Sequence, residues 1–528
     1  MIANITVDTT KLEREIEGFG VGVNLAAWDY YLSASPDTGL GTSPSAQTIA
    51  MLQDAGFNVL RLSNGSGADN SHFNIPSTDA PIGTGLLANM VAAVGTGGLV
   101  TINYGTGTPQ EAAAYLAYLN GALGNPFEIG VDANGKDWGT VDSWAKIRKA
   151  VPLGQDPLDM LRVGRSAPFG ISRFEVGNEI YFADWDGAPK EVSPTDYVNF
   201  AHSFAALALM IDPTASIGLG LGNPIEWDMP WNIPVLQQCK ALGYTPGFIS
   251  DHFYVYDGTI ETLTDRELLR ESVSDPTSAM PNHGLSPRNW TGRANAYRTL
   301  LTNELGPAGA MVELVCAELN SDSDAANKQS TSLVRGLFVA DAIGAVLQTE
   351  YRAVVYWNLR NGYAPLADNK SFFGWRTGAD EGLIGTDTAP PPASGPFVPY
   401  PAYFGVQLAT NLTSGGGAVV SVTSDTERLS AYAVKLANGH LAMLVINKSR
   451  TTDFDADIGI IGLLPTSPAT AWTYGRDEDI AQRNSADGNA SLTMTANLDL
   501  NVAASGSGGK FSFTFKSYSM VVFDIPLT

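Results

Sequence analysis

The chain has 528 residues, of which 44% are hydrophobic, so it is long enough to bury a large core and to form more than one domain. Its formal net charge of −23 repels phosphate backbones and argues against nucleic acid as a partner. The sequence contains no apolar run of the roughly 18 residues that a membrane-spanning helix needs, which argues against a membrane partner.

The first residues form a strand-like segment, "NITVDTT" (4–10), and not the charged and apolar regions of a signal peptide. We therefore expect that a signal peptide is absent or has been removed. The excess of acidic residues fits a secreted or periplasmic protein, and a cytoplasmic location stays open.

Short, mostly continuous apolar runs alternate with helical patterns between about residues 16 and 395. Such runs are typical of strands that are buried on both faces of a parallel sheet. Eight runs predict strands, at 16–24, 58–63, 98–103, 173–178, 215–221, 247–253, 312–318 and 353–358.

Helical patterns lie between these strands, for example at 45–56, 108–121, 193–212 and 332–348. Two of them open with a capping residue followed by proline, Thr108-Pro109 and Ser193-Pro194. The connection 124–172 is interpreted as an elaborated loop around the barrel mouth. Eight strand-then-helix units predict the α/β class and a closed (β/α)₈ TIM barrel, in preference to a doubly wound sheet.

A proline-rich stretch, "APPPASGPFVPYP" (389–401), ends this pattern. A short helix is predicted at 402–412, and alternating strand patterns follow it. They predict a C-terminal antiparallel β-sandwich domain. The expected domains are residues 1–15 as a strand that joins the sandwich, 16–395 as the catalytic barrel and 396–528 as the β-sandwich.

The carboxyl ends of the barrel strands are where reacting groups are expected. Glu179, preceded by Asn178, follows the fourth predicted strand, and Glu318 ends the seventh. A single strand-end glutamate is more often a solvated charge or a helix cap. Two carboxylates on opposite sides of the barrel mouth, however, favour retaining glycoside hydrolysis, in which one attacks the anomeric carbon and the other protonates the leaving oxygen.

Polar and aromatic side chains at the strand ends are candidate substrate-binding groups. A tyrosine or Arg61 can keep a nucleophilic carboxylate ionised, and aromatic rings can stack on sugar faces. The candidates are Asn24, Arg61, Asn103, Asn178, Trp185, His252, Tyr254, Tyr256 and Trp357. The sequence has no Cys/His spacing typical of a zinc site and no phosphate or dinucleotide loop, so we expect neither a metal nor another cofactor.

The segments that carry these residues resemble clan A retaining glycoside hydrolases, most closely the family 51 α-L-arabinofuranosidases. "INYGTGTPQEAAAYLAYLNG" (102–121) is similar to that family's third-strand and helix signature, and "FEVGNEIYFADW" (174–185) is similar to its Gly-Asn-Glu segment. The resemblance implies that Glu179 is the acid/base, that Asn178 binds the sugar 2-hydroxyl and that Glu318, in "CAELN", is the nucleophile.

Two segments depart from the family pattern. Asn24 stands where the family has a Glu-His pair that grips the furanose, and "SNGS" (63–66) replaces its Pro-Gly-Gly-Asn. Both changes touch the subsite that reads the scissile sugar. Membership of the clan is therefore better supported than specificity for arabinofuranose. From the resemblance, the substrate expected first is an α-L-arabinofuranoside of a plant-type polysaccharide or oligosaccharide. A family 44-like endo-β-1,4-glucanase or xylanase, a β-glucuronidase or β-xylosidase of the same clan, and a non-catalytic carbohydrate-binding protein are the alternatives. Exo or endo action and the oligomeric state stay open.

Overall fold

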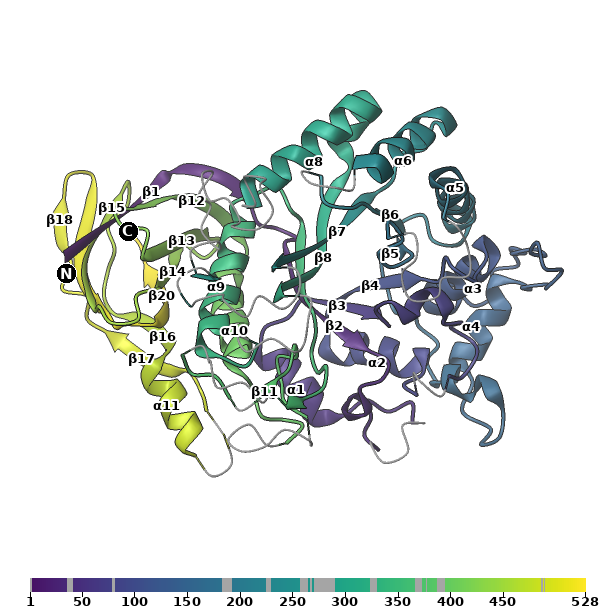
Figure 1. Cartoon of the computed structure of the whole chain (residues 1–528), viewed down its shortest axis with the longest axis horizontal. Coiled ribbons are helices and arrows are strands. Elements are labelled where there is room, and N and C mark those ends of the chain that lie inside the picture. Colours follow the sequence, from purple (N-terminus) through teal and green to yellow (C-terminus); the bar gives the residue numbers. More distant parts are fainter. Residues whose placement is uncertain are drawn as a thin grey trace.

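The computed structural model describes residues 2–35, 41–77, 81–182, 192–224, 229–256, 265, 268–269, 290–322, 330–365, 373–376, 378–386, 395–485, 488 and 490–528. A barrel and a strongly curved sheet lie side by side, with α9 (Leu333–Leu347) and α10 (Pro401–Thr413) between them (Figure 1). The predicted helix at 402–412 is α10.

Eight parallel strands close into a barrel, in which the last strand pairs with the first. The strands are β2 (Gly20–Ala26), β3 (Val59–Ser63), β4 (Gly97–Ile102), β5 (Arg173–Val176), β6 (Ser216–Gly220), β7 (Phe248–Tyr256), β8 (Glu313–Asp322) and β9 (Ala353–Tyr356). Every residue of β2, β3 and β9 is buried, which explains the continuous apolar runs. The predicted α/β fold and TIM barrel are confirmed.

Helices surround the barrel (Figure 1). Besides α9 they are α1 (Ala46–Asp54), α2 (Thr84–Val94), α3 (Pro109–Asn120), α4 (Val141–Lys149), α5 (Pro194–Ile211), α6 (Met229–Leu242) and α8 (Trp290–Leu305). The expected caps form: the Thr108 hydroxyl accepts from the backbone N–H of Glu111 at 3.1 Å. Interpreting 124–172 entirely as a loop was wrong, because α4 lies within it and starts at a capping box made by Thr140 and Ser143.

The second sheet has ten strands, in the order β17-β16-β20-β14-β13-β12-β1-β15-β19-β18. β1 (Ile2–Glu15) pairs antiparallel with β12 and parallel with β15, so the sheet is mixed and not purely antiparallel. The other strands are β12 (Gly417–Ser424), β13 (Leu429–Leu436), β14 (His440–Asn447), β15 (Phe454–Ile461), β16 (Ala469–Gly475), β17 (Thr493–Leu498), β18 (Ala503–Ser505), β19 (Gly508–Phe515) and β20 (Ser519–Pro526).

The central strands β13, β14 and β20 of this sheet are mostly buried on both faces. One face encloses a core that includes Ile5, Met443 and Phe523. The other face packs on the helices that also cover the barrel: the Tyr432 hydroxyl of β13 donates to the Asp341 carboxylate of α9 at 2.6 Å. Residues of α9 and of this face of the sheet, such as Val434 and Leu444, belong to the same core as the barrel, so the curved sheet is fixed to the wall of the barrel.

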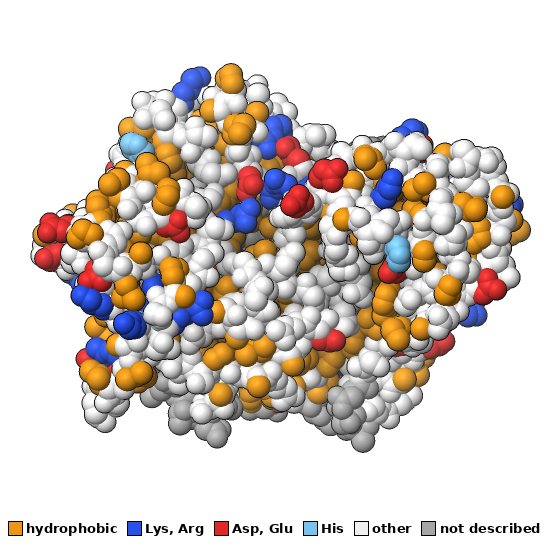
Figure 2. Space-filling view, turned by 180° about the vertical axis from the view of Figure 1, so that it is seen from behind, with side chains coloured by type: hydrophobic (Ala, Val, Ile, Leu, Met, Phe, Trp, Pro, Cys, Tyr) orange, Lys and Arg blue, Asp and Glu red, His pale blue; other side chains and the backbone are white. Residues whose placement is uncertain are grey.

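The remaining described elements are a two-residue strand pair, β10 (Ala364–Pro365) with β11 (Gly378–Ala379), the helix α11 (Arg476–Asn484), and short 3₁₀ helices at Tyr30–Leu32, Gly67–Asn70, Pro157–Leu161 and Gly306–Met311. Among the described residues, no helix combines the length and the apolarity needed to cross a lipid bilayer. On the face shown in Figure 2, acidic and basic side chains are interspersed with hydrophobic ones.

Candidate active site

Arg61, on β3, lies at the centre of a buried polar cluster inside the barrel and is 0% exposed. Its Nη1 atom donates to the Asn24 side-chain oxygen and to Oε1 of Glu318, both at 2.7 Å. Its Nη2 atom donates to the side-chain oxygen of Asn178 at 2.9 Å, and its Nε atom donates to Glu175 at 2.8 Å. One guanidinium group thus ties together side chains from β2, β5 and β8 and the turn after β5.

Glu175, inside β5, is the ion-pair partner of Arg61 and was not predicted from the sequence. Burial would raise the pKa of its carboxyl group, but the charges of Arg61 and His252 together with the Ser250 hydrogen bond outweigh this and lower the pKa to about 2. Thr101 also donates to this carboxylate, at 3.1 Å. The available signal was a carboxylate between the apolar residues Phe174 and Val176 of a strand, because a buried charge requires a partner.

Glu179 projects from a tight turn directly after β5. Gly177 has φ 70° and Glu179 has φ 51°, which is the left-handed region and is uncommon for a residue with a side chain. The Asp69 carboxylate holds this turn in place by accepting from the backbone N–H groups of Asn178, at 2.9 Å, and Tyr104, at 3.0 Å. Burial raises the pKa of Asp69 to about 6 although these hydrogen bonds oppose it.

Glu318, on β8, faces Glu179 across the mouth and is 4% exposed. Each of its carboxylate oxygens accepts one hydrogen bond, Oε1 from Arg61 at 2.7 Å and Oε2 from the Tyr254 hydroxyl at 2.6 Å. Burial raises the pKa of Glu318, while the charges of His252 and Arg61 and the Tyr254 hydrogen bond act in the opposite direction.

His252, on β7, lies between the carboxylates. Its Nδ1 atom is 2.9 Å from Oε1 of Glu179 and 3.5 Å from Oε2 of Glu318, and its Nε2 atom is 3.5 Å from Glu175. Burial would lower the pKa of this imidazole, but the three carboxylates raise it to about 10. At neutral pH the ring is therefore a cation.

One oxygen of Glu179, one oxygen of Glu318 and one nitrogen of His252 all lie within 4.8 Å of one another. Such a group could also ligate a metal ion. Metal binding requires a neutral imidazole, however, and the pKa of about 10 favours a protonated ring. The arrangement is therefore better suited to two carboxylates held beside a cationic imidazole than to a metal ion.

The other predicted residues lie in different surroundings. Asn24 is 0% exposed and its amide nitrogen donates to two backbone carbonyl groups. Its side-chain oxygen is thereby held in place to accept the hydrogen bond from Arg61. The Asn103 side chain binds Thr106 and shapes the loop after β4. Trp357 lies 6.1 Å, between ring centroids, from Trp28. Trp185 and the side chain of Tyr256, the last residue of β7, lie outside the described residues.

A search against protein-family models finds no match. A probable alpha-L-arabinofuranosidase C of Aspergillus fumigatus is 24% identical over 182 residues, which is 34% of this chain and 27% of that protein. The match thus spans about a quarter of the length of this curated relative.

Solved structures match over nearly the whole length. The GH51 alpha-L-arabinofuranosidase of Thermotoga petrophila superposes with a TM-score of 0.66 at 17% identity, covering 99% of each chain. The chain has the fold of the family 51 arabinofuranosidases. A family 44 xyloglucanase of Paenibacillus polymyxa also superposes on this chain, with a TM-score of 0.60 at 13% identity over 100% of each chain. The resemblance in architecture expected from the sequence is confirmed.

Proposed function

We propose that this protein is a retaining glycoside hydrolase in which Glu318 is the nucleophile and Glu179 the acid/base. The carboxylate pair carries the proposal, because one oxygen of each residue lies within 4.8 Å of the other across the barrel mouth. Retaining enzymes place their two carboxyl groups about 5–5.5 Å apart, whereas inverting enzymes leave roughly 6.5–9.5 Å for a water molecule.

In the first step an oxygen of Glu318 bonds to the anomeric carbon while the glycosidic bond breaks, and Glu179 gives its proton to the leaving oxygen. In the second step Glu179 takes a proton from water, and the water oxygen displaces Glu318 from the anomeric carbon. Arg61 and Tyr254 hold one oxygen of Glu318 each, so the carboxylate is oriented before it attacks and stabilised when it leaves.

The charges of the cluster explain how it can hold the single proton that this mechanism requires. Two cations, Arg61 and His252, face three carboxylates, so one bound proton makes the cluster neutral. Glu175 stays ionised because its pKa is about 2. The proton that the mechanism requires is therefore not held by Glu175.

For the substrate, we propose an α-L-arabinofuranoside first, because the likeness to family 51 arabinofuranosidases extends over 99% of the chain. The second candidate is an endo-acting glucanase or xylanase. It is favoured by the likeness to family 44 enzymes and by buried Asn24, which cannot grip a furanose in the manner of the family 51 Glu-His pair.

The test is hydrolysis of a panel of nitrophenyl glycosides, with arabinan, xylan and carboxymethyl cellulose, by the full chain. We expect release from nitrophenyl α-L-arabinofuranoside, and a loss of about 10⁴-fold or more in kcat for Glu318→Ala. Activity on xylan or the cellulose derivative alone would select the second candidate. Near-wild-type turnover by Glu318→Ala would refute the assigned nucleophile.

A further inference from the structure

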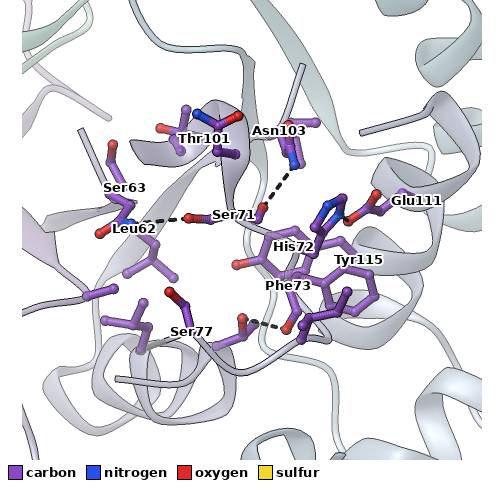
Figure 3. A pocket seen from close by; sticks show the side chains of 18 of the residues that line it. Leu62, Ser63, Ser71, His72, Phe73, Ser77, Thr101, Asn103, Glu111 and Tyr115 are labelled. Carbon is purple, nitrogen blue, oxygen red and sulfur yellow. Dashed lines mark hydrogen bonds and ion pairs between the residues drawn. The ribbon is translucent and has the colours of Figure 1, made fainter. Parts of the chain in front are cut away.

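A separate cavity of about 410 Å³ lies beside the barrel mouth (Figure 3). Its walls come from the ends of β3 and β4, from α2 and α3, and from the segment that follows β3. Of the described residues that line it, none belongs to the carboxylate pair. The volume falls within the range of small-ligand pockets.

The polar part of the lining is uncharged overall. Nδ1 of His72 lies 2.8 Å from Oε1 of Glu111, and this hydrogen bond raises the pKa of His72, which favours a neutral ion pair. The other polar groups are hydroxyls and amides, among them those of Ser63, Ser71 and Asn103. Among the described residues that line the cavity there is no lysine, arginine or aspartate. The lining therefore suits a neutral ligand with many hydroxyl groups better than a phosphate or a carboxylate.

One side of the cavity is apolar. The rings of Phe73 and Tyr115 are stacked at 4.8 Å, with 6° between their planes, and Figure 3 shows them across the open space from Leu62. An apolar wall next to hydroxyl and amide groups matches a sugar ring, which presents C–H groups on its face and hydroxyl groups at its edge. Asn64 also lines the cavity, and its side-chain nitrogen donates to the hydroxyl of Ser71 at 3.1 Å.

The cavity adjoins the active-site cluster through Thr101. This residue lines the cavity, and its hydroxyl donates to the carboxylate of Glu175 at 3.1 Å. Glu175 in turn pairs with Arg61, which holds Glu318. We propose that the cavity binds a neutral sugar unit of the substrate, separate from the unit that is cleaved. This proposal rests on the proposed function. It predicts that the protein binds more than one sugar unit of a polysaccharide or oligosaccharide.

The test measures binding by calorimetry to the full chain carrying Glu318→Ala, which prevents hydrolysis. The probes are α-1,5-arabinotetraose, xylotetraose and cellotetraose, with tetragalacturonate as the charged counterpart. His72→Phe removes a polar group of the lining but keeps a ring, and Ala112→Leu adds bulk to the lining. We expect each change to weaken binding of the preferred neutral tetrasaccharide about tenfold or more.

The matched control is His202→Phe, which makes the same substitution on α5, where the imidazole packs 5.5 Å from the ring of Tyr244. It should leave binding unchanged. Unchanged binding in both cavity variants, tighter binding of tetragalacturonate, or no binding of any neutral probe would overturn the proposal.

The cavity variants are also made with Glu318 present. Their turnover of the nitrophenyl monosaccharide should stay within about twofold of wild type, because that substrate does not reach the cavity. A larger loss there would contradict a separate sugar site. Absence of any hydrolysis by the wild-type chain refutes the proposed function, and the binding experiment still reports on the cavity.

Discussion

Nη1 of Arg61 lies 2.7 Å from Oε1 of Glu318 at a point where both side chains are at least 95% buried. Nη2 of the same guanidinium lies 2.7 Å from Glu175, which is equally buried. Arg61 therefore pairs with two buried carboxylates, and it links the stability of the barrel to the position of the proposed nucleophile.

Arg61→Met should strongly destabilise the protein. It leaves two buried carboxylates without their cation, and breaking a buried pair in this way costs about 3–5 kcal/mol. Urea unfolding of the variant measures this loss. The control is Lys516→Met, which breaks the exposed pair between Lys516 and Asp453 and should cost less than about 1 kcal/mol. Equal losses in the two variants would contradict the role given to Arg61.

Tyr254→Phe should lower kcat about 100-fold while the protein stays folded, because it removes the 2.6 Å hydrogen bond to Oε2 of Glu318 and little volume. Steady-state kinetics on the preferred nitrophenyl glycoside measures this. Tyr403→Phe is the matched control, since its hydroxyl contacts Asp54 away from the cluster. A Tyr254→Phe variant with wild-type kcat would show that this hydroxyl does not act on the nucleophile.

His252 should make stability fall as the pH rises. Its pKa is raised from 6.5 to about 10, so its contribution is complete below pH 6.5 and is lost as the pH rises toward 10. Between these two pKa values the folded state binds one more proton than the unfolded state. Over that range the free energy of unfolding falls by about 1.4 kcal/mol for each unit that the pH rises.

Urea unfolding of wild type and His252→Gln between pH 6 and pH 10 checks this, since the difference between the two curves isolates the one group. The wild-type curve should be steeper than that of the variant. Parallel curves for wild type and His252→Gln would mean that His252 is not held as a cation.

Asp69→Asn should lower kcat because the Asp69 carboxylate positions the turn that carries Glu179. An amide can accept with one of its two ends only, so one backbone N–H loses its partner at a cost of about 1–3 kcal/mol. Asp132→Asn is the matched control, because Asp132 accepts from the backbone N–H groups of Asn134 and Lys136 in a loop away from the cluster. Both variants should lose stability, but only Asp69→Asn should lose activity. Equal kcat values in kinetic assays of the two would contradict the positioning role.

The barrel was predictable because its strands are buried on both faces, which leaves continuous apolar runs in the sequence. Glu179 and Glu318 were proposed from the sequence because both were expected at strand ends. The structure places Glu179 after the end of β5 and Glu318 inside β8, which continues to Asp322. Glu175 was missed because the strand-end rule ignores the interior of a strand. β15 is hard to predict because its alternating aspartate and glycine residues have low strand propensity, and its pairing with β1 and β19 is visible only in the fold.

Position in the sequence alone does not show which polar residues face the pocket. Asn24 and Arg61 stand near strand ends, as Tyr254 does, yet both are fully buried beneath the carboxylate pair. Their orientation depends on hydrogen bonds between strands far apart in the chain, such as that from Arg61 to Asn24. Asp69 was missed for the same reason, since it acts through backbone groups of Tyr104 and Asn178 that only the fold brings near it.

The measurement that tests the central claim most directly is azide rescue of Glu179→Ala, followed by proton NMR of the product formed from an activated aryl glycoside. If Glu179 is the acid/base and Glu318 forms a glycosyl intermediate, azide restores turnover of the second step and yields a glycosyl azide with the anomeric configuration of the substrate. A glycosyl azide of inverted configuration, or turnover that azide does not change, would contradict the double-displacement mechanism at this carboxylate pair.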